Sequence, residues 1–360
     1  MNDKEQSIET LRGLAILLVV AGYIIKDDLH PETGSAITSF LEYIYYFLKP
    51  IRMPLFTVIS AYLYAASPAT QESFKKLVTG KARRILIPYF VVSAMQYIFF
   101  SIFHMNGPHR LDEILRIYLW PFEQFWFLWA IFLIFIAIGF LDSINSLDTK
   151  KKCLGWIITL VPFYVFLDLP RFLALRGIFY LLPFFILGYC LRRFSKDLFT
   201  PQMIRLYLMS LLFSYPAYLI FYSPTATFEE PVRKILMLWV TFSALPLIFH
   251  FRPTVPLLAK LGYYAFGIHI FNKICSALPR MVFEHFNIYN DILIMITYLG
   301  VGLFLSIAIS SILERYNLTR FFILGMKEIP NTVPKATSPV LPTPAQSVVP
   351  LTNPIKPRET

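Results

Sequence analysis

Apolar runs long enough to cross a membrane follow one another along most of the chain. A transmembrane helix needs about 20 mostly apolar residues to span ~30 Å of hydrocarbon. Ten such runs lie at residues 12–28, 51–68, 85–105, 122–142, 153–170, 174–192, 203–222, 233–251, 256–278 and 290–313. An amphipathic stretch, Ile37 to Leu48, precedes the second run and is expected to lie at the membrane surface. The pattern predicts an all-α integral membrane protein with about ten transmembrane helices in one bundle.

The composition supports this prediction. The 360 residues are 56% hydrophobic and 15% charged, with a mean hydropathy of +0.58, whereas a soluble domain has about a quarter of its residues charged. The net charge of +11 would suggest nucleic acid as a partner of a soluble protein. Here the charges lie in loops between apolar runs, so membrane topology explains them better and no nucleic-acid partner is expected.

The distribution of Lys and Arg predicts an orientation. Cytoplasmic loops carry an excess of these residues. If the N-terminus is cytoplasmic, ten spans place 22 of the 33 Lys and Arg residues in inside segments and the other 11 in outside segments. We therefore expect both termini in the cytoplasm.

The two ends of the chain differ from its middle. The N-terminus is polar and no small-residue cleavage site follows the first apolar run, so we expect that run to be a retained span rather than a signal peptide. Eight prolines fall between Pro330 and Pro357 without periodicity. Such a sequence cannot build a core. We predict a multi-span domain over residues 7–325 and a Pro-rich, disordered cytoplasmic tail over 326–360.

The cysteines offer no metal-ligand spacing. Cys153, Cys190 and Cys275 are scattered singly, so they are expected to be buried thiols and no metal is predicted.

Polar residues within apolar runs are candidate functional residues, because their burial in hydrocarbon is costly. Arg12 and Tyr23 lie 11 residues apart in the first run, within about 20° of three full turns, so they share a face and are separated by about 16 Å along it. The alternative is an arginine whose head reaches the headgroups and a tyrosine at the interface.

Three further runs carry such residues. Arg52 and Ser60 lie on either side of Pro54 in the second run, where small-residue helix packing is the alternative. Glu123 opens the fourth run shortly before Trp126, and could instead be a solvated loop carboxylate. His269, Asn272 and Lys273 share one face of the ninth run through their i, i+3 and i+4 spacing, although a lone helical histidine is usually a packing residue.

A basic group precedes the third run. It comprises Lys75, Lys76, Lys81, Arg83 and Arg84. These residues could set the orientation of the protein in the membrane and contact anionic lipid headgroups. Alternatively, they could bind a phosphorylated donor.

Six motifs in order resemble the family 3 integral-membrane acyltransferases over about residues 7–325. They are Glu9-Thr-Leu-Arg12-Gly-Leu-Ala, Arg52-Met-Pro-Leu-Phe-Thr-Val-Ile-Ser60, Lys81-Ala-Arg-Arg84-Ile-Leu-Ile-Pro88-Tyr, Phe125-Trp-Phe-Leu-Trp-Ala-Ile-Phe, Leu182-Pro-Phe-Phe-Ile-Leu-Gly188-Tyr and Ala265-Phe-Gly-Ile-His269. The family's first-span signature is a basic residue, ten intervening residues and then a histidine. Arg12 matches the basic residue, whereas Tyr23 stands where the histidine is expected. Gln124 and Asn272 likewise occupy positions that are often histidine.

The resemblance implies an enzyme of the inner membrane of a bacterium. It would move an acyl group, in the first place acetyl, from acetyl-CoA at the cytoplasmic face to a hydroxyl of a polysaccharide or lipid-linked sugar, with membrane lipids and glycan-synthesis proteins as partners. We assign catalysis to Tyr23, His269, Glu123 and Asn272, donor binding to Arg12, Arg83 and Arg84, and acceptor binding to Arg52, Ser60 and Trp126.

Two other functions remain open at this stage. A relative that has lost catalysis could act in glycan assembly or export, since a tyrosine with a pKa near 10 is a poor base at neutral pH. A transporter is the third hypothesis. The absence of a visible internal repeat argues against it, because many transporters are built from repeats.

Overall fold

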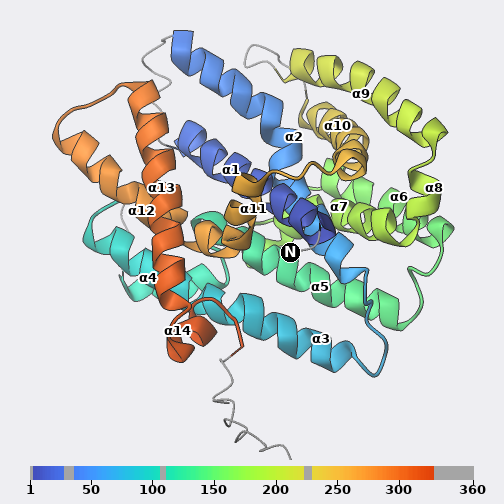
Figure 1. Cartoon of the computed structure of the whole chain (residues 1–360), viewed down its shortest axis with the longest axis horizontal. Coiled ribbons are helices and arrows are strands. Elements are labelled where there is room, and N and C mark those ends of the chain that lie inside the picture. Colours follow the sequence, from blue (N-terminus) through green and yellow to red (C-terminus); the bar gives the residue numbers. More distant parts are fainter. Residues whose placement is uncertain (1–2, 28–35, 106–110, 223–228, 328–360) are drawn as a thin grey trace, which may run out of the picture. The chain divides into compact units, whose positions relative to one another are not determined.

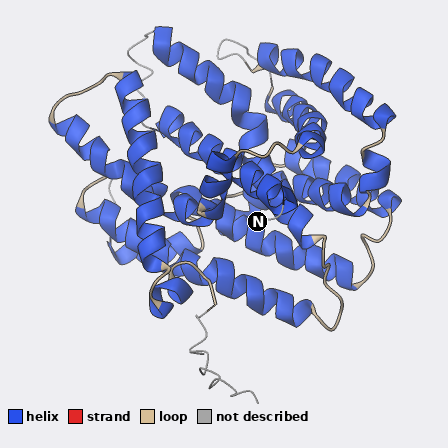
Figure 2. Cartoon of the chain, in the orientation of Figure 1, coloured by secondary structure: helices blue, strands red, loops and turns tan. Residues whose placement is uncertain are grey.

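The computed structural model describes residues 3–27, 36–105, 111–222 and 229–327. Within these ranges the regular structure is helical and contains no strand (Figure 2), which confirms the all-α prediction. The described helices belong to one packed unit. Nearly all of the Pro-rich tail, residues 328–360, lies outside the described ranges.

The helices follow one another with short connections (Figure 1). The longer α-helices are α1 (Asp3–Asp27), α2 (Ala36–Tyr64), α4 (Ile87–Ile102), α5 (Trp126–Ser143), α6 (Lys150–Phe166), α7 (Leu175–Arg193), α9 (Pro201–Phe221), α10 (Glu230–Phe251), α12 (Ala265–His285) and α13 (Asp291–Leu313). The shorter ones are α3 (Phe74–Lys81), α8 (Ser195–Leu198), α11 (Pro256–Tyr263) and α14 (Asn317–Phe322). A π-helical segment, Ala82–Leu86, joins α3 to α4, and a 3₁₀ turn, Glu123–Phe125, leads into α5.

Seven helical segments of the described chain are long and apolar enough to cross a membrane. They are Glu5–Asp27, Phe74–Ile102, Glu113–Ser143, Phe172–Arg193, Pro201–Phe221, Glu230–Phe251 and Asp291–Leu313. The other three predicted runs also fall in helices. The run at 153–170 lies largely in α6, which has 17 residues, and the runs at 51–68 and 256–278 fall largely in α2 and α12.

The helix α2 contains both the predicted surface stretch and the second apolar run, which the sequence suggested were separate elements. The stretch from Ile37 to Leu48 exposes Phe40 and Tyr43, as a surface stretch should. It is nevertheless continuous with the second apolar run, so that α2 extends over 29 residues and contains Pro50 and Pro54.

Neighbouring helices allow α2 to continue through its prolines. A proline has no N–H, so the carbonyl four residues earlier loses its partner within the helix. Pro50 frees the carbonyl of Tyr46, which accepts a 3.0 Å hydrogen bond from the Tyr218 hydroxyl. Pro54 frees the carbonyl of Pro50, which accepts a 2.8 Å hydrogen bond from the Thr241 hydroxyl. The amphipathic pattern alone does not reveal these partners, which lie in α9 and α10.

Two glycines hold α11 directly against α1. A Cβ on Gly13 would lie 1.8 Å from the carbonyl oxygen of Leu258, and a Cβ on Gly262 would lie 1.9 Å from the carbonyl oxygen of Glu9. The Thr10 hydroxyl accepts a 3.1 Å hydrogen bond from the backbone N–H of Val255, the residue that precedes α11. This contact fixes the start of α11, and α11 in turn leads into α12.

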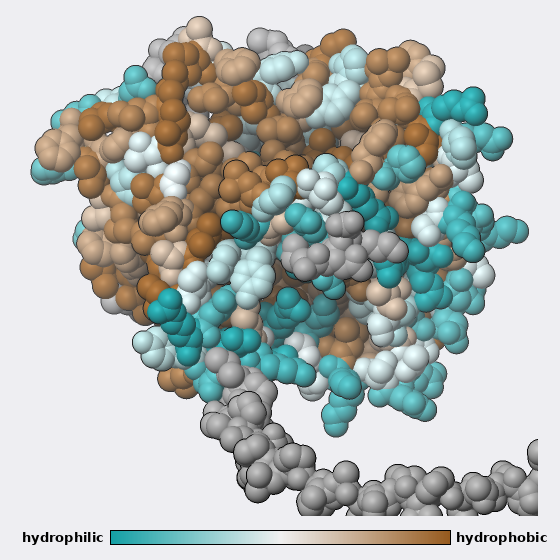
Figure 3. Space-filling model, viewed as in Figure 1, coloured by the Kyte–Doolittle hydropathy of each residue, from teal (hydrophilic) through white to brown (hydrophobic). Residues whose placement is uncertain are grey.

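The outward surface of several helices is apolar, as expected beside lipid. The helix α9 exposes Leu212 and Phe213, and α13 exposes Ile296 and Phe304. In the view of Figure 3 hydrophobic surface covers α13 and the upper part of the molecule, whereas hydrophilic residues gather near the beginning of the chain and over α3 and α8.

We expect Gly262→Ala to destabilise the fold, because the added methyl group would meet backbone that cannot rotate away. Overpacking of this kind costs about 1–3 kcal/mol. The control is Gly300→Ala on α13, where a Cβ would meet nothing within 4 Å. Thermal unfolding of the detergent-purified proteins should show a clearly lower Tm for the first variant only. Equal Tm values for both variants would contradict the close contact between α1 and α11.

Candidate functional site

A group of charged side chains meets where α1 ends, which we call the Asp27 end of the bundle. The Lys273 ammonium, on α12, forms ion pairs with Asp27 and, at 3.3 Å, with Glu123. The Lys273 side chain is 9% exposed, so both carboxylates stabilise a cation that could not stand alone at this depth. Glu123 adopts a left-handed φ of 47°. A non-glycine residue in that region is strained by about 1–2 kcal/mol, and such strain often accompanies functional sites.

Arg52 lies against α1 because Gly22 has no side chain. A Cβ at Gly22 would stand 1.8 Å from Nη1 of Arg52. The Nη2 atom of Arg52 donates a 2.9 Å hydrogen bond to the Tyr45 hydroxyl, and the guanidinium packs over the Tyr45 ring at 4.4 Å from its centroid. The Nη1 atom is buried and has no hydrogen-bond partner.

Tyr23 lies among these charges. Arg52, Lys273, Asp27 and Glu123 all interact electrostatically with its hydroxyl, and the Lys273 ammonium is 5.1 Å from the centroid of its ring. The hydroxyl is buried and has no hydrogen-bond partner.

His269 lies one helical turn before Lys273 on α12. It is 4% exposed, and its ring packs edge-on to Phe127 at 5.5 Å between centroids. Its Nε2 atom is buried and has no hydrogen-bond partner.

Three buried polar atoms at the Asp27 end thus have no partner: the Tyr23 hydroxyl, Nη1 of Arg52 and Nε2 of His269. Buried polar groups are nearly always hydrogen-bonded, so orphaned ones call for an explanation such as an absent ligand. Their donors and acceptors would suit a molecule that offers both a hydroxyl group and a carbonyl oxygen.

The other candidate residues of this part occupy less direct positions. The side-chain amide of Asn272 donates 2.9 Å hydrogen bonds to the carbonyls of Ile268 and His269, so it supports its own helix. Trp126 packs against the backbone at Gly177. Ser60 is about 12 Å along α2 from Arg52, so the structure does not bring these two residues together.

A second cluster surrounds Arg12, at what we call the Arg12 end. Arg12 pairs with Glu9 at 2.6 Å between Nη1 and Oε1. Arg84 interacts electrostatically with Arg12 and Lys81. It also interacts with Arg83 and Glu9. These cations, among them the predicted donor-binding residues Arg12, Arg83 and Arg84, therefore come together from α1 and from the α3–α4 junction. One oxygen of Glu9, Oε2, is buried without a partner.

Irregular backbone presents the basic residues of this cluster. Arg83 and Arg84 lie in the π-helical segment, and such bulges are rare and frequent at functional sites. Gly325, with φ of 63°, packs its backbone against them, since a Cβ there would be 2.6 Å from the Arg84 carbonyl oxygen. The Lys81 ammonium lies 3.4 Å from the centroid of the Phe135 ring. The tight backbone contact fixes the position from which both arginine side chains extend.

Several members of the two clusters were missed by sequence reasoning. Asp27, Gly22 and Glu9 were not chosen as site residues. Lys81 was noted only as part of the basic group before the third run, and Lys273 only for the face that it shares with His269. The spacing of Tyr23 and Asp27 at i, i+4, and of Glu9 and Arg12 at i, i+3, is a signal that could have identified the two acids. Nothing in the sequence marks Gly22.

The described residues contain no group of three or more His, Cys, Asp or Glu side chains that could hold a metal ion. Cys153 and Cys275 are buried free thiols, as predicted, whereas Cys190 is only partly buried.

Removal of the Lys273 charge should destabilise the protein, because Lys273→Met leaves two carboxylates without their cation. Removal of one partner from a fully buried ion pair lowers the free energy of unfolding by about 3–5 kcal/mol. Because Asp27 and Glu123 are partly exposed, we expect a loss of stability at or below that range. The triple variant Lys273→Met/Asp27→Asn/Glu123→Gln should recover part of the lost Tm. Additive losses would show that the three side chains do not interact.

The sequence of residues 5–315 matches the family model described as an acyltransferase domain, that of the family 3 acyltransferases. No curated protein and no solved structure matches the chain. Because the family match extends over most of the chain, and because the described helices include seven that are suited to cross a bilayer, the protein belongs to the family 3 acyltransferases and is a multi-pass membrane acyltransferase.

Proposed function

We propose that the protein transfers an acyl group, in the first place acetyl, from acetyl-CoA to a hydroxyl of a cell-surface polysaccharide or lipid-linked sugar. The observation that supports this most directly is the set of three unpartnered polar atoms on Tyr23, Arg52 and His269. They come from three helices and are buried beside a charged network. The protein would act in the inner membrane of a bacterium, with its termini and its Arg12 end in the cytoplasm and its Asp27 end toward the outside.

The Arg12 end would hold the donor. Coenzyme A carries several phosphate groups, and guanidinium groups bind phosphates through paired, charge-assisted hydrogen bonds. Arg12, Arg83 and Arg84, together with Lys81, offer four cations, and Glu9 is the acid that pairs with Arg12. The two clusters lie at either end of the 11 residues that separate Arg12 from Tyr23, about 16 Å along α1, so the extended arm of the donor would run beside this helix.

The Asp27 end would perform the transfer. His269 would accept the proton of the acceptor hydroxyl at Nε2, since a neutral imidazole is an effective base near pH 7. The hydroxyl oxygen would then attack the thioester carbonyl, and the collapsing intermediate would release the thiolate of CoA, which takes up a proton. The Tyr23 hydroxyl and Nη1 of Arg52 are donors suited to the negative oxygen that develops on the carbonyl. Tyr23 thus need not replace the missing histidine as a base.

Glu123 and Asn272 would support this chemistry rather than take part in it. Glu123 pairs with Lys273. Asn272 bonds the backbone carbonyl of His269. Trp126 and Ser60 would contact more distant parts of the acceptor. Glycan-synthesis proteins would supply the acceptor.

A catalytically inactive relative is the second candidate, favoured by the tyrosine at position 23. The two functions differ in one experiment, in which membranes containing the protein are incubated with labelled acetyl-CoA and cell-envelope glycans. The wild type should transfer label, and His269→Gln should lower the rate by about 10²–10⁴-fold, the usual contribution of a general base. The control is His285→Gln, an exposed histidine on the same helix. An inert wild type that gains activity through Tyr23→His would favour the inactive relative, and uptake by proteoliposomes without acetyl-CoA would indicate a transporter.

The donor site makes a separate prediction. Arg84→Gln should raise the KM for acetyl-CoA by about 10- to 100-fold, since a hydrogen bond to a charged group contributes about 1.5–3 kcal/mol. The kcat at saturating donor should change little, because the substitution is remote from the reacting atoms. The matched control is Arg205→Gln, an exposed arginine on α9. A lowered kcat with unchanged KM would place Arg84 outside the donor site.

A further inference from the structure

A small pocket opens at the Asp27 end, away from the candidate active site. It lies between the end of α6, the start of α7 and the start of α10, and it has a volume of ≈ 210 Å³ with its open mouth included. Its lining residues are Phe163, Tyr164, Leu167, Leu169, Arg176, Phe179 and Lys234. Much of that space is open to solvent, so the pocket is a shallow recess at the surface.

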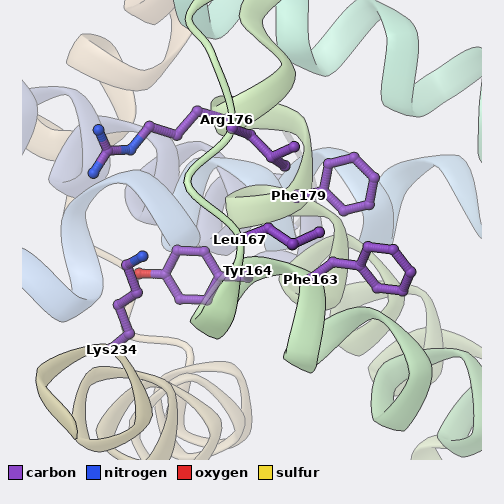
Figure 4. Close-up of a pocket in the computed structure, with 7 residues that line it drawn as sticks. Phe163, Tyr164, Leu167, Arg176, Phe179 and Lys234 are labelled. Atoms are coloured by element: carbon purple, nitrogen blue, oxygen red, sulfur yellow. The ribbon is translucent and has the colours of Figure 1, made fainter. Parts of the chain in front are cut away.

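One side of the pocket is cationic. Figure 4 shows Arg176 and Lys234 on the same side, with the Tyr164 hydroxyl directed toward Lys234. Both cations form 3.2 Å ion pairs with a single carboxylate, that of Glu230. Two positive charges thus share one negative charge. The Lys234 side chain is only 14% exposed, whereas Glu230 is 62% exposed and could turn away into water. An anion would complete the neutralisation.

The opposite side is apolar and continues onto the outer surface. The rings of Phe163 and Phe179 stack at 5.5 Å between centroids and stand opposite the cations in Figure 4. Phe163, Leu167 and the neighbouring Phe166 are 42%, 46% and 70% exposed. These positions lie where α6 reaches the end of its apolar run, at the level where acyl chains meet headgroups.

We infer that this pocket binds the phosphate headgroup of an anionic lipid, with Arg176 and Lys234 on the phosphate and the first part of the acyl or prenyl chain along Phe163 and Leu167. A soluble anion would make no use of the apolar side, and an uncharged lipid would leave the excess positive charge unmatched. Interfacial cations attract anionic lipids in the same way. The inference does not depend on the proposed reaction.

Two sources can supply such a headgroup: a bulk phospholipid and a lipid-linked sugar phosphate. Tyr164 packs against Tyr180 at 5.3 Å between ring centroids, and Tyr180 interacts electrostatically with Arg52. These two tyrosines therefore lie between the pocket and the charge of Arg52. A sugar attached to the bound phosphate would lie near them.

Native mass spectrometry of the detergent-purified full chain tests the pocket directly. The probes are phosphatidylglycerol, zwitterionic phosphatidylcholine, inorganic phosphate and a polyprenyl-phosphate sugar. The wild type should retain phosphatidylglycerol in preference to phosphatidylcholine, and Arg176→Gln/Lys234→Gln should weaken that retention about tenfold or more. The control is Arg171→Gln, an exposed arginine near the same pocket that does not line it.

A second variant keeps the proposal testable should the double variant fail to fold. Glu230→Gln removes the competing carboxylate from an exposed position, so it should strengthen retention of phosphatidylglycerol by a few-fold. Unchanged lipid retention in both variants would overturn the proposal, as would full competition by inorganic phosphate. Displacement of phosphatidylglycerol by the polyprenyl-phosphate sugar would support it and assign the site to a lipid-linked sugar. Retention of phosphatidylglycerol against that competitor would support it and assign the site to a structural lipid.

Discussion

Hydrocarbon offers no hydrogen bonds, so every polar group that these helices carry into the membrane must find its partner within the protein. The prolines of α2 illustrate the constraint. The carbonyls that Pro50 and Pro54 free are bonded by Tyr218 and Thr241 from neighbouring helices. The Lys273 ammonium is likewise held between the carboxylates of Asp27 and Glu123. The buried atoms without a partner, among them those of Tyr23, Arg52 and His269, are exceptions to this constraint.

The helix α1 connects the two clusters of charged residues. Its first half joins the basic residues of the α3–α4 junction through Arg12 and Glu9, and its last turns bring Tyr23 and Asp27 to Lys273. Close packing keeps this helix in place, because Gly13 admits the backbone of α11 and Gly22 admits the guanidinium of Arg52. Small residues on α1 thus determine where charged residues of other helices lie.

The charges at the Asp27 end are arranged differently from those at the Arg12 end. Acids and bases alternate around Tyr23, so the local charge is close to balance and a neutral hydroxyl group can enter. Around Arg12 the cations outnumber the acids, which suits a phosphate-bearing molecule. The pocket at Arg176 and Lys234 follows the second pattern, with an apolar side in addition.

The sequence by itself determined the helical class, the position of most helices and the family. Long apolar runs and short motifs carry this information locally. It did not determine that Glu123 pairs with Lys273, that Asn272 bonds its own helix, or that Ser60 lies away from Arg52. Lipid-facing and buried faces of these helices are both apolar, so hydrophobic periodicity cannot state which helices are neighbours. Only the tertiary structure decides which polar residues meet, because each pairing depends on close contacts such as that between Gly22 and Arg52.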